Sequence, residues 1–525
     1  MESVQEKAVK TEPNGQDYFV EVKDLKTQFF TSKGIVKALD GVTLGIRRGE
    51  IFGLVGESGC GKSVTASSIM DLIPDPPGKI MAGSVFIDGF NILSDLKKLS
   101  KVTIKSETNV KIKRNKRLIK RHNFILSQIR GKTVSMIFQE PSLSLNPVLS
   151  IGSQIEEAVL LHSRIEIANA ILRRSQISEE DIRKFLESSS TISDPYKKRG
   201  AVRVWCRNYG VAELDERIYE AVLSNNDPTV ISKEILSLIN ESNQRVDLVA
   251  IGEARDYYKY EEDLFKLNRD LIQAESENSR EKIDIVQAKI QELKKSVGSK
   301  FFSYKILRRF LKRKFERPFH LAARSRAIEM LEMVNIPEPE RTLDSFPHEL
   351  SGGMQQRAMI AMSLATNPKM LIADEPTTAL DVTTQAQILD LIKDLKNVTG
   401  SSILFITHDL AVIAEMCDRV GVMYGGNLVE EASVNDIFFN PKHPYTTGLL
   451  SSIPREFGKE RRNMKLSTIP GSVPNLITPP SGCRFHPRCK FAMDVCKEKK
   501  PKLVELETGH KVACFLYSSE TEENA

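Results

Sequence analysis

The octapeptide Gly56-Glu57-Ser58-Gly59-Cys60-Gly61-Lys62-Ser63 fits the pattern G-x-x-x-x-G-K-S. It follows the apolar run Glu50 to Val55, which predicts a buried strand, and it opens a helical pattern from Ser63 to Leu72. The glycines let backbone N–H groups surround phosphate oxygens, Lys62 adds positive charge, and the Ser63 hydroxyl can ligate Mg²⁺. The alternative is a glycine turn with a chance Lys-Ser, but strand, loop and helix in this order indicate a nucleotide-binding α/β domain.

A second pattern places two acids, Asp374 and Glu375, directly after the apolar run Met370 to Ala373. Adjacent carboxylates at the end of a buried strand are costly unless they bind something. Asp374 is placed to hold the Mg²⁺ shell through water, and Glu375 is placed to polarise an attacking water as general base. Strands often end in Asp, so this pattern becomes a strong indication only beside the phosphate loop.

A third pattern, Leu350-Ser351-Gly352-Gly353-Met354-Gln355-Gln356, precedes a segment rich in Ala and Met that we expect to be a helix. Ser-Gly-Gly at a helix N-terminus makes a second anion site, and the alternative is simple helix capping. Two anion sites and one nucleotide suggest that the second site serves ATP bound by a partner.

These patterns resemble the ABC ATPase family, whose signature motif is LSGGQ-like. The resemblance implies that Ser351, Gly352 and Gly353 contact the γ-phosphate of ATP held in a partner's phosphate loop. It implies that Gln139, in Phe138-Gln139-Glu140-Pro141, belongs to the Q-loop, which links nucleotide to membrane subunits, and joins the Mg²⁺ shell. Asp381, in Ala379-Leu380-Asp381, matches the D-loop.

The same resemblance assigns His408, in Ile406-Thr407-His408-Asp409, as the switch histidine that steadies the γ-phosphate. Without the other motifs, the favoured interpretation of His408 is an ordinary polar residue at the end of a strand. Phe29 is the candidate for stacking on adenine; a core Phe is the alternative, and Phe30 is adjacent. The predicted catalytic residues are Glu375, His408, Gln139 and Lys62.

Further segments resemble the first of the two ATPases of oligopeptide/dipeptide permeases. They are Gly61 to Val64, Ser68-Ile69-Met70, Ile73-Pro74, His443-Pro444-Tyr445-Thr446, Ile469 to Pro474, and Gly482 to Cys489. In that family the Q-loop and the signature lie much closer together than Gln139 and Ser351 do here. We therefore expect residues 163–320 to be an insertion that the family pattern does not explain.

The last four cysteines of the sequence have the spacing Cys483-x5-Cys489-x6-Cys496-x17-Cys514. In a cytosolic chain such a cluster suggests metal rather than disulfides, but paired C-x2-C knuckles are missing. Four thiolates suit zinc or an iron–sulfur cluster, and free thiols are the remaining alternative. The resemblance favours a structural [4Fe–4S] cluster, because peptide-permease ATPases carry this spacing.

Charge is unevenly distributed along the chain. Lys97 to Lys132 holds 13 Lys/Arg and one acid, Glu107, and we call this stretch the basic segment. It reads either as a solvated loop or as a contact for anionic lipid or RNA. No run of 18 apolar residues and no signal-peptide core occurs, so we expect a cytoplasmic chain whose membrane role comes through partners.

The expected fold is α/β: a P-loop NTPase with a RecA-like ABC ATPase core, an antiparallel β subdomain and a helical signature subdomain. Residues 253–300 predict long helices or a short coiled-coil hairpin. The predicted parts are a tail (1–18), the first ATPase part (19–162, basic insertion about 97–130), the inserted, mostly helical region (163–320), the second ATPase part (321–440) and the C-terminal Cys module (441–525).

The expected function is ATP hydrolysis, with ATP and Mg²⁺, powering oligopeptide or dipeptide import from the cytoplasmic side of the cell membrane. The expected partners are a second, non-identical ATPase, two transmembrane permeases and an extracellular peptide-binding lipoprotein. Lys111 to Arg121 is a candidate contact for anionic lipid or an acidic partner loop. The alternatives are an importer of nickel or another small solute, and a soluble ABC protein acting on ribosomes or nucleic acid. One phosphate loop and one signature argue against the last, so we expect no nucleic acid partner.

Overall fold

The computed structural model describes residues 18–106, 109–224, 227–244, 246–277, 279–297, 300–377, 380–452 and 469–517. The chain divides into two compact units. Unit 1 takes residues 1–93, 401–404 and 409–525, and unit 2 takes residues 94–400 and 405–408.

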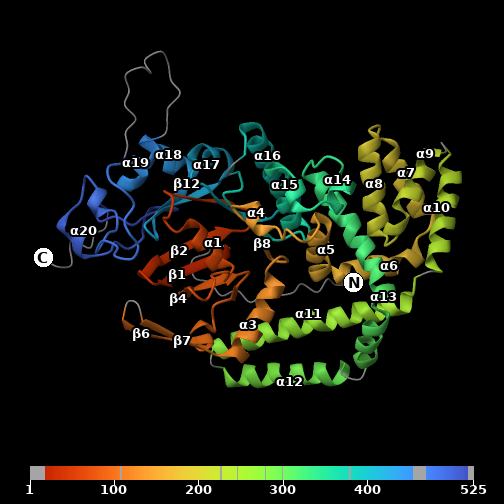
Figure 1. Cartoon of the computed structure of the whole chain (residues 1–525), viewed down its shortest axis with the longest axis horizontal. Coiled ribbons are helices and arrows are strands. Elements are labelled where there is room, and N and C mark those ends of the chain that lie inside the picture. Colours follow the sequence, from red (N-terminus) through yellow and green to blue (C-terminus); the bar gives the residue numbers. More distant parts are fainter. Residues whose placement is uncertain are drawn as a thin grey trace, which may run out of the picture. The chain divides into compact units, whose positions relative to one another are not determined.

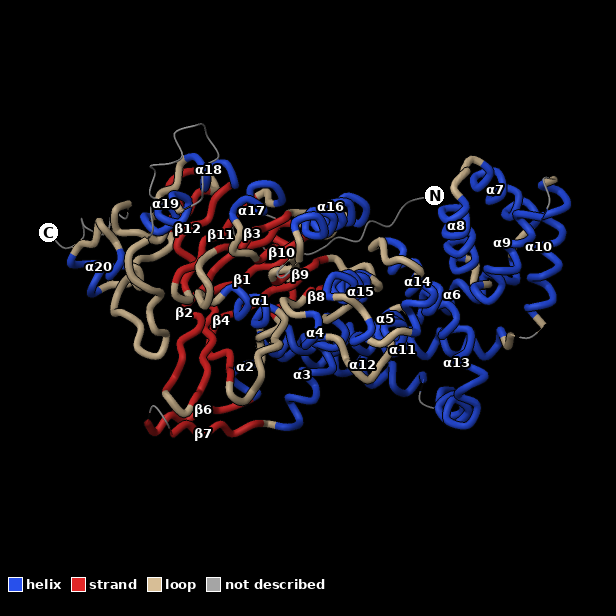
Figure 2. Tube along the Cα trace, turned by 45° about the horizontal axis from the view of Figure 1, so that its top comes forward, coloured by secondary structure: helices blue, strands red, loops and turns tan. Residues whose placement is uncertain are grey.

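An antiparallel sheet occupies the N-terminal part of unit 1. β1 (Tyr18–Thr31) pairs with both β2 (Gly34–Arg47) and β4 (Gly78–Ile87), and β5 (Phe90–Asn91) completes the order β2-β1-β4-β5 (Figure 2). Buried and partly exposed residues alternate along β1, as expected for strands with one face on a core.

The phosphate loop lies between a buried strand and a short helix of unit 1. β3 (Ile51–Val55) is buried at every residue, and α1 (Lys62–Ile69) begins directly after the loop. β3 pairs in parallel with β11 (Arg419–Tyr424), which pairs in antiparallel fashion with β12 (Asn427–Ser433). β14 (His510–Val512) and β13 (Val504–Glu507) continue this sheet beyond β12. The helices of this part are α17 (Leu410–Met416), α18 (Val434–Phe439), α19 (Pro444–Ser451) and α20 (Asp494–Glu498).

Unit 2 contains the parallel pair β8 (Val134–Ile137) and β9 (Met370–Asp374). Because the strands are parallel, their carboxyl ends meet at the same edge, where Ile137 pairs with Ala373. The last residues of β10 (Ser402–Ile406) also belong to this unit. The helices that accompany these strands are α4 (Pro141–Ser144), α5 (Ile151–His162), α14 (Pro339–Asp344), α15 (Gly352–Leu364) and α16 (Val382–Thr399).

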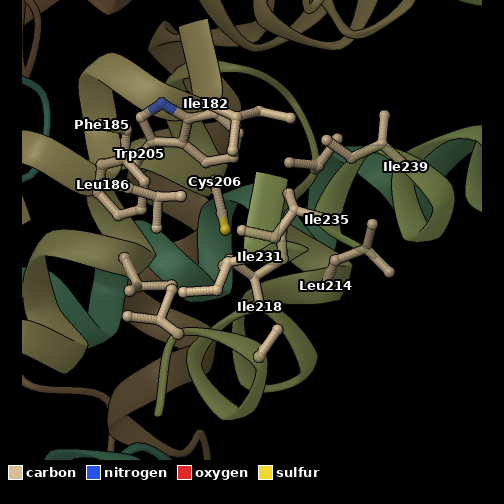
Figure 3. Packing of buried hydrophobic residues seen from close by; sticks show 14 of the residues in the cluster. Ile182, Phe185, Leu186, Trp205, Cys206, Leu214, Ile218, Ile231, Ile235 and Ile239 are labelled. Atoms are coloured by element: carbon tan, nitrogen blue, oxygen red, sulfur yellow. The ribbon is translucent and has the colours of Figure 1, made fainter. Parts of the chain in front are cut away.

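Between α5 and α14 the described chain is helical and contains a core of its own. The helices are α6 (Arg164–Arg173), α7 (Glu179–Ser190), α8 (Pro195–Asn208), α9 (Asp215–Ser224), α10 (Pro228–Asn243), α11 (Leu248–Ser276), α12 (Arg280–Val297) and α13 (Lys300–Met333). Figure 3 shows how apolar side chains of α7 to α10 converge on Trp205 and Cys206. Ile231, Ile235 and Ile239 contribute because a spacing of four residues keeps them on one face of α10.

The next two helices after this core form an antiparallel pair. α11 and α12 lie side by side along much of their length (Figure 1). The sequence predicted long helices or a helical hairpin for residues 253–300, and this prediction is confirmed. None of the helices in the described ranges is both long and apolar enough to cross a membrane.

The basic segment is not a loop, contrary to one of the two interpretations that its charge allowed. It forms α2 (Leu96–Leu99), the paired strands β6 (Ser100–Ser106) and β7 (Asn109–Arg114), and α3 (Lys116–Ile129). Ile125, Leu126 and Ile129 are buried on one side of α3, whereas Lys116, Arg117 and Lys120 are exposed. The physical reason is the amphipathic spacing of the few apolar residues, which the density of positive charge obscures.

Candidate functional site

The phosphate loop is held in a conformation that only glycine tolerates at key points. Gly56 has φ 149°, and a Cβ there would lie 2.2 Å from the carbonyl oxygen of Met423. Gly61, with φ 107°, is the N-cap of α1. Lys62 is buried, and its Nζ donates to the carbonyl oxygens of Gly56 at 2.8 Å and Glu57 at 3.3 Å. The ammonium group therefore lies inside the loop, where the N-terminus of α1 also favours an anion.

The other loop residues divide into exposed and buried groups. Ser58 and Gly59 are exposed, Glu57 and Ser63 are half-buried, and Cys60 is fully buried. Burial raises the pKa of the Cys60 thiol, so this cysteine stays protonated and acts as packing rather than as a nucleophile. Ser63 stands at the start of α1, which places a hydroxyl oxygen, a donor that Mg²⁺ accepts, at the helix N-terminus.

Three predicted catalytic residues of unit 2 meet at the carboxylate of Glu375. Gln139 Nε2 donates to Oε2 of Glu375 at 2.9 Å, and Nδ1 of His408 lies 3.4 Å from its Oε1. The backbone N–H of Glu375 donates to the carbonyl oxygen of Ile406 at 2.9 Å. These residues follow β8, β9 and β10, so the carboxyl ends of three strands bring them together. Asp374, the preceding residue, is buried at the end of β9.

Glu375 itself has an unusual backbone. Its φ is 46°, in the left-handed region that residues other than glycine and asparagine rarely adopt. Such conformations cost of order 1 kcal/mol or more and cluster at functional sites. The residue in this conformation is the one whose carboxylate contacts Gln139 and His408.

The signature residues stand at the N-terminus of α15. Ser351 is the N-cap, and its Oγ accepts the backbone N–H of Met354 at 3.4 Å. A Cβ on Gly352 would meet no atom within 4 Å, so this turn faces open space. Gln356 Nε2 donates to the carbonyl oxygen of Pro376 at 2.7 Å, which connects α15 to the residues that follow Glu375. Capping and an anion site are therefore compatible at this N-terminus.

Two further predicted residues have clear local roles. Asp381 is the N-cap of α16 and accepts hydrogen bonds from N and Oγ1 of Thr384 at 3.0 and 2.7 Å, which lower the pKa of its carboxyl. Its neighbour Ala379 lies outside the described residues. Phe29 is half-buried in β1, with its ring edge against Gly78 of β4. Its role in stacking on adenine stays a prediction.

The four C-terminal cysteines line one small cavity of about 20 Å³ together with Phe485, His486 and Phe491. Burial and the neighbouring thiols raise the pKa of Cys483 and of Cys514 to about 11. Among the described residues, no three His, Cys, Asp or Glu side chains are spaced to hold a single metal ion. Cysteine thiolates are the ligands of iron–sulfur clusters, and the cluster stays a prediction for these four thiols.

Two residues that contact the phosphate loop had no predicted role. Arg488 donates to the carboxylate of Glu57, and Tyr445 accepts the Glu57 backbone N–H. Both stand in segments that resemble peptide-permease ATPases, His443 to Thr446 and Gly482 to Cys489. The resemblance was therefore the only available signal for them.

Comparison with known proteins identifies the family. The ABC transporter model matches residues 39–218 and 254–378, which is more than half of the chain. A second model, described as the C-terminal region of oligopeptide/dipeptide transporters, matches residues 429–496. The expected ABC ATPase fold is thereby confirmed.

Alignments with similar proteins cover nearly the whole chain. The probable peptide ABC transporter ATP-binding protein y4tR of Sinorhizobium fredii is 34% identical, and the alignment covers 95% of each chain. The oligopeptide transport ATP-binding protein AppD of Bacillus subtilis is 34% identical over 96% of this chain and 99% of its own. OppD of the same organism is 33% identical over 95% of this chain and 88% of its own. The chain belongs to the ABC transporter family, as an ATP-hydrolysing subunit that carries the oligopeptide/dipeptide transporter C-terminal region.

Proposed function

We propose that this ATPase powers the import of oligopeptides or dipeptides across a bacterial cell membrane, acting from the cytoplasmic face. The observation that carries the chemical part is the carboxylate of Glu375, held by Gln139 at 2.9 Å and approached by His408 at 3.4 Å. The C-terminal region at residues 429–496 and the relatives named for peptide transport support the choice of substrate.

In the proposed mechanism, water attacks the γ-phosphorus in line with the leaving oxygen. Glu375 orients this water and accepts its proton, Lys62 neutralises charge on the phosphates, and His408 steadies the γ-phosphate. Gln139 fixes the Glu375 carboxylate and connects it to the segment that follows β8. The oxygens of Ser63 and Asp374 suit Mg²⁺, which supplies further neutralisation of the phosphates when bound.

The proposed assembly contains a second, non-identical ATPase, two permeases and an extracellular peptide-binding lipoprotein. Ser351, Gly352 and Gly353 would then bind the γ-phosphate held by the second ATPase, and the open space beside Gly352 supports this. Asp381 and Phe29 keep their proposed places near the nucleotide. The parts of the chain keep the boundaries proposed from the sequence, at residues 18, 162, 320 and 440.

Transport of labelled peptide tests this function. A strain lacking the chain should lose uptake of labelled dipeptides and oligopeptides, and wild-type chain should restore it while Glu375→Gln should not. Restoration of nickel uptake instead would support the alternative small solute. Growth and ribosome profiles that depend on the chain, with unaltered uptake of either solute, would support the ribosomal alternative.

We also propose that Cys483, Cys489, Cys496 and Cys514 hold a structural [4Fe–4S] cluster. Their common cavity supports a shared four-thiol site. In anaerobically purified protein, Cys489→Ser should remove the iron and the broad visible absorption. The matched control Cys206→Ser changes a thiol in the helical core and should leave both unchanged. Stoichiometric zinc without iron would refute the cluster.

Finally, we propose that the basic segment contacts anionic lipid. Lys113, Arg114, Lys116, Arg117 and Lys120 are exposed on β7 and α3, and Lys or Arg near an anionic surface contributes about 1 kcal/mol each. Replacing these five residues with Gln should weaken binding to phosphatidylglycerol vesicles at low salt. Replacing exposed Lys289, Lys294 and Lys295 of α12 is the control and should have a smaller effect. Equal vesicle binding by all three proteins would leave the basic segment as a solvated surface.

A further inference from the structure

Glu57 places an acid inside a loop built to bind anions. It is the second residue of the phosphate loop, and its carbonyl oxygen accepts a hydrogen bond from Lys62 Nζ at 3.3 Å. A free carboxylate at this position would repel the phosphates of a nucleotide and would compete with them for the Lys62 ammonium. The chain therefore needs a partner that neutralises Glu57 and holds it aside.

Arg488 is that partner. Its Nη1 donates to Oε2 of Glu57 at 2.7 Å, and its Nη2 donates to Oε1 at 3.1 Å. This is the bidentate fork that guanidinium forms with carboxylates. The bond to Glu57 raises the pKa of Arg488, so the guanidinium stays charged.

The Arg488 side chain is locked in place by further bonds. Its Nε donates to the carbonyl oxygen of Pro470 at 2.9 Å, Nη1 also donates to the Tyr424 hydroxyl at 3.3 Å, and Nη2 also donates to the carbonyl oxygen of Ile469 at 3.4 Å. Together with the two bonds to Glu57, these use all five N–H groups of the guanidinium. The side chain is 6% exposed. Arg488 therefore holds Glu57 from a fixed position rather than as a mobile surface charge.

Tyr445 holds the backbone of the same residue. Its hydroxyl oxygen accepts the Glu57 N–H at 3.0 Å, and its ring is fully buried against Tyr424 and Phe485, with centroids 4.6 and 5.4 Å apart. Nδ1 of His443 accepts the Tyr445 backbone N–H at 3.0 Å. Burial lowers the pKa of His443 to about 3, so its ring is neutral and free to accept this bond.

We propose that Arg488 and Tyr445 are positioning residues of the nucleotide site, through which the C-terminal module sets the charge and shape of the phosphate loop. Arg488 cancels the repulsion between Glu57 and the phosphates, and Tyr445 fixes the course of the backbone at Glu57. Arg488 immediately precedes Cys489, so the segment that carries the thiols also carries the group that the loop needs. ATP affinity therefore depends on the C-terminal module, although that module contains no residue assigned to the nucleotide.

Nucleotide titration of the purified full-length chain tests the proposal. Arg488→Gln should weaken ATP binding about tenfold, which corresponds to about 1.4 kcal/mol. The double variant Arg488→Gln with Glu57→Gln should recover most of this loss, because it removes the charge that Arg488 neutralises. Arg488→Lys keeps the positive charge and should lose less affinity than Arg488→Gln. In the assembled transporter, Arg488→Gln should raise KM for ATP more than it lowers kcat.

The matched control is Arg484→Gln. Arg484 lies in the same segment, is also buried, and binds the carbonyl of Lys37 and the carboxylate of Asp40 rather than the phosphate loop. A purely structural role for Arg488 predicts that both variants lower the melting temperature together, and that Glu57→Gln restores nothing. Wild-type ATP affinity in Arg488→Gln, or a double variant no tighter than the single one, would overturn the proposal.

Discussion

Replacement of Glu375 by Gln separates nucleotide binding from hydrolysis. The Glu375 carboxylate is bound by Gln139 and approached by His408, and the side chain is 11% exposed. Glutamine has the same shape, so its amide oxygen still accepts a hydrogen bond and its amide N–H groups can face His408. We therefore expect the site to keep its geometry and to lose a charge and a base.

Two magnitudes decide which loss dominates. A charged hydrogen bond contributes about 1.5–3 kcal/mol and a neutral one about 1 kcal/mol, so the exchange weakens the local structure by at most about 2 kcal/mol. Removing a general base lowers the rate about 10²- to 10⁴-fold, which equals about 2.7–5.4 kcal/mol of activation free energy. The variant should therefore bind ATP nearly as the wild type does and hydrolyse it at least about a hundredfold more slowly.

The assay is phosphate release by the assembled transporter, with ATP affinity measured on the same samples. Glu292→Gln, an exposed substitution in α12, is the matched control and should leave both quantities unchanged. Turnover within threefold of the wild-type rate would refute Glu375 as the base. Loss of ATP binding in Glu375→Gln would show instead that the carboxylate shapes the site.

Three further outcomes follow from the packing, the buried histidine and the signature. Ile235→Ala leaves a cavity at a fully buried position of the helical core and should lower the free energy of unfolding by about 3 kcal/mol. The loss should appear as faster hydrogen exchange across residues 179–243. The control Val230→Ala, at a position that is 47% exposed, should change little. Burial lowers the pKa of His443 in the folded chain to about 3, from an ordinary value of about 6.5. As pH drops below about 6.5 the unfolded chain takes up a proton that the folded chain does not, so the free energy of unfolding should fall. His443→Asn should lose less stability between pH 7 and 5, and an equal loss would contradict the assignment. Because we propose that Ser351 serves a site in a second ATPase subunit, the chain alone should hydrolyse ATP slowly. Full activity from a particle with the mass of one chain would contradict this.

Local chemistry made the phosphate loop predictable. Gly56 and Gly61 need positive φ, and a buried strand and a helix flank them, so the local pattern from Glu50 to Leu72 is enough to predict this structure. Long-range contacts were not readable in this way. Gln139 and Glu375 lie 236 residues apart, and only the resemblance to a family assigned Gln139 to the same catalytic site as Glu375.

Two other features could not be predicted from the sequence. In the basic segment the charges obscured the apolar pattern, and for Glu57 and Arg488 no local pattern exists. The basic segment forms two strands and a helix, but its Lys and Arg residues outnumber the apolar positions that specify them. The pair Glu57 and Arg488 spans 431 residues, and neither residue differs locally from an ordinary surface charge. Their contact can be recognised only in the three-dimensional structure of unit 1.

The order in which strands pair also matters while the chain is being synthesised. The helical core draws its buried residues from positions 177–239 alone, so it can fold soon after it leaves the ribosome. β3 must wait much longer, because its two neighbours in the sheet, β10 and β11, begin at Ser402 and Arg419, more than 340 residues later. At about 5–20 residues per second, this delay lasts roughly 20–70 s. During that time a wholly apolar strand beside the phosphate loop has neither neighbour to pair with. We expect chaperones to bind the nascent chain at this segment.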